Sequence, residues 1–121
     1  MIIPDTSVWI DLFRGIDNLL ASPPDVKQRR LLHPFVFGEL LLGGLPTDKK
    51  LRDIVDALVP APVAHPSEVA AFIQWARLSG TGIGYVDTHL LVSAKMIGAL
   101  ILTKDQSLQA RAQRLGVAYA P

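Results

Sequence analysis

Two aspartates follow short apolar runs of the chain. Asp5 comes directly after the run at residues 1–4, and Asp105 comes two positions after the run at residues 99–103. A short apolar run bounded by turn residues is typical of a strand in a parallel sheet that is buried on both faces. Because ligands bind outside the carboxyl ends of such strands, both aspartates are candidates for chemistry.

Two further acids are isolated in apolar helical patterns. Glu39 is the only charged residue between positions 34 and 46, and its neighbours three and four positions away are all apolar or glycine. Asp87 follows a glycine-rich loop and is followed at the same spacings by two leucines. The face of a solvated helix does not carry this pattern, so we expect both carboxylates to be poorly solvated.

Four carboxylates in one place need a compensating cation. Two unit charges 4 Å apart repel by about 4 kcal/mol at an effective dielectric constant near 20. Only Arg14, Lys95 and Lys104 lie near these acids in sequence, and we expect them to contact phosphates of a substrate. Oxygen ligands without cysteine or suitably placed histidine favour Mg²⁺, with Mn²⁺ as the alternative. Such a site would hydrolyse a phosphodiester bond, in RNA or in DNA.

Simpler explanations exist for three of these acids. Asp5, Asp87 and Asp105 each stand where an acid can cap the start of a helix. No cap explains Glu39. The other seven of the 11 acids lie in polar or amphipathic surroundings and are expected to be solvated. The four acids together therefore carry more weight than any one of them.

The elements that must position these acids are short strands alternating with helices. This order predicts an α/β fold with three layers, in which helices cover both faces of a central parallel sheet of about five short strands. Strands are expected at residues 1–4, 29–33, from 63, 99–103 and 117–120, and helices at 7–14, 34–44, 47–58, 67–78, 86–97 and 107–115, with one helical turn at 18–22. Thr47 and Ser67 are the expected caps of two of these helices.

Length and composition limit the class of protein. The 121 residues fit a single domain, 1–121, and 50% hydrophobic with 19% charged residues excludes a disordered chain. The absence of cysteine excludes disulfides and thiolate metal sites. A net charge of +1 shows no overall attraction to nucleic acid. No apolar stretch of about 20 residues and no leader pattern is present, so we expect a cytoplasmic protein without membrane association. The mean hydropathy of +0.32 suggests an apolar surface covered by a partner.

The surroundings of the four acids resemble those of the PIN-domain nucleases, most closely the VapC-type toxins of toxin–antitoxin pairs. The resemblance covers essentially the whole chain, and its acids stand in the family's order. Its motifs are IIPDTSVWIDLF at 2–13, HPFVFGELLLG at 33–43, GYVDTHLLVSA at 84–94 and LILTKD at 100–105. Pro4 departs from the aliphatic residue that is frequent there, and proline requires the first strand to end at that point or to leave a hydrogen bond unmade.

The resemblance implies a function and a set of site residues. The positions that match the family's catalytic and metal-binding acids are Asp5, Glu39, Asp87 and Asp105, and those that match supporting polar positions are Ser7 and Thr103. The protein would be an Mg²⁺-dependent endoribonuclease that slows translation and is silenced by a cognate antitoxin. A homodimer is expected, and DNA would be contacted only through the antitoxin.

Other functions remain open at this point. The protein could be a PIN-domain nuclease of RNA processing, a metal-dependent phosphotransfer protein, or an inactive binding module. The sequence Asp5-Thr6-Ser7 lacks the second aspartate of the D-x-D motif that many phosphotransfer proteins carry. Trp9 and Trp75 could stack on a base, but they have helical spacing with apolar neighbours, so we favour the core or an interface for both.

Overall fold

The computed structural model describes residues 1–16, 19–21, 28–43, 45 and 48–120. Its strands are short and parallel. β1 (Ile2–Pro4) pairs with β4 (Leu100–Leu102), and β2 (Leu31–Leu32) pairs with β3 (Val59–Pro60). An isolated parallel bridge from Ile2 to Arg30 joins the two pairs, and another from Ile101 to Ala118 adds the C-terminal segment beside β4. The order across the sheet is therefore β3, β2, β1, β4 and then the segment around Ala118. The predicted parallel arrangement is therefore present, with shorter strands than the sequence suggested.

Two of the predicted strands are wrong in place or extent. The strand expected from residue 63 lies at β3 instead, because the preceding helix ends earlier than predicted. Pro60 is tolerated there since β3 lies at an edge of the sheet, and the next residue, Ala61, donates its N–H to Leu32 O at 3.0 Å. The strand expected at 117–120 is reduced to the bridge at Ala118. β1 ends at Pro4, as the missing N–H of proline requires.

The helices follow the predicted order with shifted ends. They are α1 (Thr6–Phe13), the 3₁₀ turn η1 (Leu19–Ala21), α2 (Pro34–Gly43), α3 (Lys49–Asp56), α4 (Pro66–Trp75), α5 (Tyr85–Ile97) and α6 (Gln106–Arg114). Of the predicted turn at 18–22, both end residues lie outside the described part of the chain.

The caps of two helices differ from those predicted. Asp48 caps α3 by accepting from Lys50 N at 2.8 Å, and the predicted cap, Thr47, lies outside the described residues. The ring of His65 caps α4 by accepting from the N–H of Ser67 at 3.1 Å, so Ser67 is inside the helix. A short polar side chain just before the helix satisfies N–H groups of the first turn in each case.

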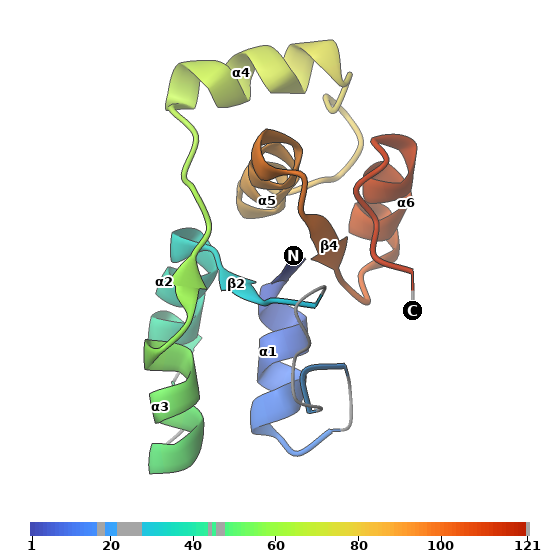
Figure 1. Cartoon of the computed structure of the whole chain (residues 1–121). Helices are drawn as coiled ribbons and strands as arrows, with labels where there is room; N and C mark the ends of the chain where they lie inside the picture. Colours follow the sequence, from blue (N-terminus) through green and yellow to red (C-terminus); the bar gives the residue numbers. More distant parts are fainter. Residues whose placement is uncertain (17–18, 22–27, 44, 46–47, 121) are drawn as a thin grey trace.

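Helices cover both faces of the strands. In Figure 1, α1 lies on one side of β1, β2 and β4, and α4 and α5 lie on the opposite side. None of the described helices is long and apolar enough to span a membrane.

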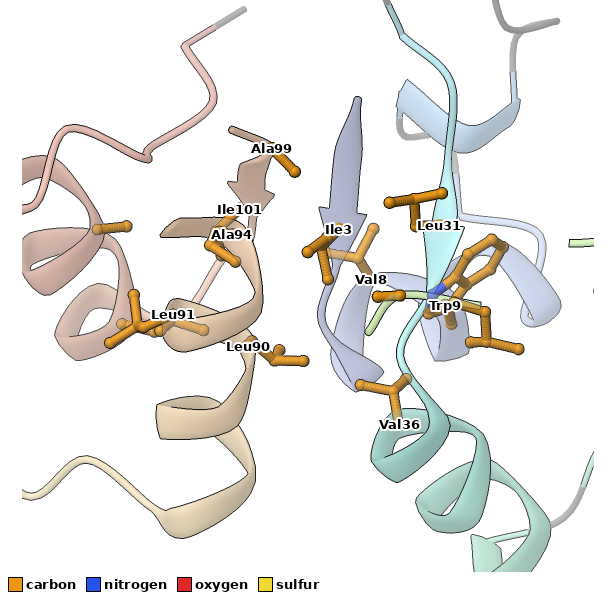
Figure 2. Close-up of a cluster of buried hydrophobic side chains, with 14 of the residues drawn as sticks. Ile3, Val8, Trp9, Leu31, Val36, Leu90, Leu91, Ala94, Ala99 and Ile101 are labelled. Atoms are coloured by element: carbon orange, nitrogen blue, oxygen red, sulfur yellow. The ribbon is translucent and has the colours of Figure 1, made fainter. Parts of the chain in front are cut away.

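The hydrophobic core lies between these layers, and the paired strands β1 and β4 end at the same edge of the sheet. Figure 2 shows Ile3 of β1 and Ile101 of β4 between the side chains of α1 and those of α5. The β1–β4 register places Pro4 opposite Leu102. The residues that follow, Asp5 and Thr103, therefore leave the sheet at the same end.

Candidate active site

Asp5 is the most firmly held of the four acids. It is buried, and its Oδ1 accepts hydrogen bonds from Ser7 Oγ at 2.7 Å and from Val8 N at 3.0 Å. Its Oδ2 accepts from Thr103 Oγ1, and its backbone N–H donates to Leu102 O at 3.0 Å. Asp5 is thus the cap of α1 and is also fixed to the end of β4. The capping role is confirmed, and the functional role of Asp5 stays a prediction.

Thr103 connects the two aspartates that follow strands. Its hydroxyl donates to Asp5 and accepts from the backbone N–H of Asp105 at 3.0 Å. Asp105 caps α6, because its Oδ1 accepts from Leu108 N at 2.8 Å. One hydroxyl therefore joins the loops after β1 and β4, which are 98 residues apart in sequence.

Glu39 reaches the same region from α2. Its Oε1 accepts a hydrogen bond from Thr6 Oγ1 at 3.0 Å, which joins α2 to the start of α1. Sequence reasoning did not assign a role to Thr6, although its place directly after Asp5 was a usable signal. Glu39 and Asp105 are both exposed, so the expectation that Glu39 is poorly solvated is wrong. The apolar neighbours of Glu39 are themselves partly exposed, since Leu41 and Leu42 face outward.

Asp87 is the acid that lies within the electrostatic influence of the other three. It lies in the first turn of α5, is half-buried, and accepts no hydrogen bond from any described residue. Its pKa is raised to about 6 by burial first and then by the negative charges of Asp5, Asp105 and Glu39. Carboxylates from four separate elements therefore lie close enough together to oppose the ionisation of Asp87.

The basic residues that are near these acids in sequence do not neutralise them. Lys104 is bound to Asp11 in a salt bridge. Lys95 lies in the last turn of α5, about 12 Å along the helix from Asp87, and donates to Leu115 O at 3.3 Å. Arg14 follows the far end of α1. The ion pairs found in the described part of the chain involve none of the four acids.

The nearby histidines do not supply a positive charge either. His33 and His89 are buried with their rings 6.0 Å apart, against Phe35 and Tyr85. Burial lowers the pKa of His33 to about 4, with a smaller contribution from His89, and burial also lowers the pKa of His89. Both rings are therefore neutral at pH 7. His33 accepts a hydrogen bond through Nδ1 from Phe35 N at 3.0 Å at the start of α2, and His89 packs against Phe35 and Tyr85.

The donor set suits a hard divalent cation, although the acids do not yet enclose one. Among the described residues, no three histidine or acidic side chains stand close enough to hold an ion directly. The mutual charge effect on Asp87 extends over longer distances than direct ligation. Mg²⁺ keeps several of its waters when bound, so acids that act through water are compatible with it. No ion pair of the described residues neutralises the four carboxylates, and this negative charge is the observation that favours a divalent cation.

Known proteins resemble this chain over almost its whole length. No protein-family model matches the chain. The chain is 36% identical over 121 residues to Ribonuclease VapC32 from two strains of Mycobacterium tuberculosis, CDC 1551 / Oshkosh and ATCC 25618 / H37Rv, covering 99% of this chain and 97% of each relative. The solved structure of FitAcB from Neisseria gonorrhoeae superposes with a TM-score of 0.63 over 98% of this chain and 95% of that chain, at 22% identity.

The two comparisons cover the whole described fold and not only the acidic motifs. The structural neighbour supports the α/β fold, with parallel strands between helices. The sequence relatives support the resemblance found in the four motifs, and they do not favour the phosphotransfer alternative. The chain therefore belongs to the VapC-type toxins of the PIN-domain nuclease family.

Proposed function

We propose that this protein is a metal-dependent endoribonuclease that acts as the toxin of a toxin–antitoxin pair. The observation that carries the proposal is the raised pKa of Asp87, because the negative charges of three other carboxylates contribute to that rise. Four negative charges gathered without a protein cation favour occupation by a divalent ion. The name Ribonuclease VapC32 of the sequence relatives supports RNA as the substrate.

The residues that would hold the ion are Asp5, Glu39, Asp87 and Asp105, with Mg²⁺ as the expected cofactor and Mn²⁺ as its substitute. When bound, the ion would stabilise negative charge on the phosphate and activate a water for in-line attack. The oxygens of Asp5 are oriented by the donors on Ser7, Val8 and Thr103.

The side chains around the four acids have distinct roles in this proposal. Thr6 orients Glu39, and Thr103 keeps Asp5 and Asp105 in register. Asp87 retains its proton below about pH 6 in the absence of the ion, so it is the acid whose charge depends most on occupation.

Hydrolysis of RNA is tested with the purified chain. We expect cleavage of single-stranded RNA with Mg²⁺ or Mn²⁺ and none with EDTA. Asp5→Asn should abolish cleavage, because asparagine retains the capping oxygen and loses the charge. Asp48→Asn is the matched control, since Asp48 caps α3 in the same way and lies outside the site. Cleavage by Asp5→Asn at the rate of the control would contradict the proposal.

The role as a toxin concerns partners and the cell. A cognate antitoxin, a homodimer and a cytoplasmic location are part of the proposal. The large apolar side chains Leu41 and Leu42, which are 52% and 92% exposed, support a surface that a partner covers. Expression of the protein alone should inhibit translation and arrest growth, and co-expression of the small neighbouring reading frame should relieve the arrest. Harmless expression of an active nuclease would point to RNA processing instead.

A further inference from the structure

A cavity lies between the carboxyl-terminal ends of α4 and α6. It has a volume of about 350 Å³ and is lined by Trp75, Arg77, Arg111 and Arg114, with Leu78 and Leu115 beneath them. Figure 1 shows the end of α4 lying close to the end of α6 that is farther from β4. We call this cavity the arginine–tryptophan pocket. No motif of the sequence indicates a role for its arginines.

The positive charges of this pocket are not neutralised by the protein. No acidic residue lines it, and none of its three arginines takes part in an ion pair or side-chain hydrogen bond within the described ranges. The two arginines of α6 lie in its last turn, where a cation is favourable because of the helix dipole. Arg77 directly follows the cap of α4, so the carboxyl-terminal ends of two helices both favour positive charge at this pocket.

The backbone of Arg77 adopts the left-handed conformation, which is unfavourable for a residue other than glycine. Its φ is 54°, and among the described residues it is the only non-glycine residue with a positive φ. It stands just after Ala76, the cap of α4, at the position where glycine is usual. A non-glycine residue in this conformation costs about 1 kcal/mol or more, and such residues concentrate at functional sites.

Trp75 provides an aromatic surface beside these charges. Its side chain is 68% exposed, whereas Trp9 is 1% exposed in the core. Of the two expected places, the core is therefore excluded for Trp75, and an interface stays a prediction. Trp75 contacts Phe72 at a ring distance of 5.8 Å and an angle of 47°. An exposed indole among guanidinium groups is the combination that binds single-stranded nucleic acid, in which bases stack and phosphates pair with cations.

The position of the pocket suits a strand of RNA that also reaches the carboxylates. α6 begins next to Asp105 and ends at Arg114, which is about 14 Å along the helix at 1.5 Å per residue. The phosphates of an extended single strand are spaced more widely than the rise of about 3.4 Å per strand of a duplex, so about two or three nucleotides span this distance. Lys95, which donates to Leu115 O at 3.3 Å, adds a further positive charge beside the pocket.

We propose that the arginine–tryptophan pocket binds a segment of single-stranded RNA several nucleotides away from the bond that is cleaved. One base stacks on Trp75, and the arginines contact the adjacent phosphates. The proposal rests on the proposed ribonuclease function, because it deepens the recognition of that same substrate. It makes the enzyme favour RNA that is long enough to reach both places.

Binding is measured with the full chain carrying Asp5→Asn, so that the RNA is not cut. A labelled single-stranded RNA of about 20 nucleotides is titrated by fluorescence anisotropy from about 50 to about 200 mM salt. Adding Arg111→Gln and Arg114→Gln should raise the Kd about tenfold and reduce the slope of log K against log salt by about 0.7 for each lost contact. The control pair Arg29→Gln and Arg52→Gln removes the same charge elsewhere and should change the Kd less than about twofold.

Stacking is measured by intrinsic fluorescence. Trp9 is buried, so quenching by RNA reports on Trp75. We expect Trp75→Ala to weaken binding about tenfold and Trp75→Phe to retain most of it. With Asp5 intact, the pocket variants should cleave a dinucleotide RNA normally and a long RNA more slowly.

Each alternative outcome can be recognised. Affinities and salt slopes equal to those of the control pair would overturn the proposal. So would a pocket variant that turns a dimer into a monomer while binding RNA normally, because the pocket would then be a contact between copies. A wild-type chain that cleaves no RNA with any divalent cation would refute the proposed function instead, whatever the binding assay shows.

Discussion

The two ends of α6 have opposite electrostatics. At its start, Asp105 joins three other acids with no cation among them. At its end, Arg111 and Arg114 join a third arginine with no acid among them. Neither group is favourable by itself, since like charges repel. The contrast is what the two proposed ligands require, a small cation at the first place and an anion at the second.

The two places also differ in how rigidly they are built. Asp5 receives three hydrogen bonds, and Thr103 connects it to the neighbouring loop. The arginines are long side chains without hydrogen bonds to the described part of the protein. Fixed donors suit an ion with defined coordination geometry, whereas flexible cations suit a backbone whose phosphates vary in position. The following predictions test this difference, beginning with the largest effect.

The largest effect is expected from Asp87→Asn. The variant removes one of four charges that the ion would need, so RNA cleavage should fall by about 100-fold or more. The RNA affinity of an Asp5→Asn chain should change little when Asp87→Asn is added, because binding depends on the far end of α6. Single-turnover cleavage and anisotropy measure the two quantities. Equal losses in both would show that the two ends are not separate.

A smaller effect is expected from Thr103→Val. The variant removes the hydroxyl that joins Asp5 to the loop of Asp105, and loss of such a supporting hydrogen bond reduces activity by about 10- to 100-fold. The free energy of unfolding should fall by about 1–2 kcal/mol. Thr103→Ser retains the hydroxyl and should restore most of the activity. If Thr103→Ser and Thr103→Val lose the same activity, the hydroxyl has no positioning role.

The stability of the metal-free chain should depend on pH through Asp87. Its folded pKa of about 6 is above the ordinary value of 3.8, so protonation favours the folded state, and that stabilisation is lost as pH rises through about 6. Because Asp87 is only half-buried, we expect a loss of about 1–2 kcal/mol as the pH rises from the ordinary pKa of 3.8 to the folded pKa of about 6 in EDTA, after allowance for solvent screening. Asp87→Asn should flatten this part of the profile in urea denaturation. An unchanged profile would mean that Asp87 does not feel the other acids.

The smallest effect is expected from Arg77→Gly. Glycine adopts a positive φ without strain, so the free energy of unfolding should rise by roughly 0.5–1 kcal/mol. Affinity for long RNA should fall a few-fold, since one guanidinium is lost. A more stable chain that binds RNA less well would show that the strain at Arg77 is retained for binding. Ser79→Gly in the neighbouring loop is the control for glycine itself.

Much of the site followed from the order of residue types. Acids directly after apolar runs predict carboxylates at one end of a parallel sheet, and the register of β1 with β4 places Asp5 and Thr103 there. The strand at 59–60 is not predicted from the sequence, because Pro60 and Pro62 indicate the end of a helix and not the edge of a sheet. Helix ends were shifted where a better cap, such as Asp48 or His65, stood next to the predicted one.

The sequence by itself determined which side chains carry charge and which elements they follow, because apolar runs and caps are local properties of the chain. Only the tertiary structure decided which of them meet. It exposed Glu39 and brought it to Thr6, placed Lys104 on Asp11, and brought Arg77 to the end of α6. These contacts join residues distant in sequence, and they depend on how whole helices pack on the sheet, which no local pattern specifies.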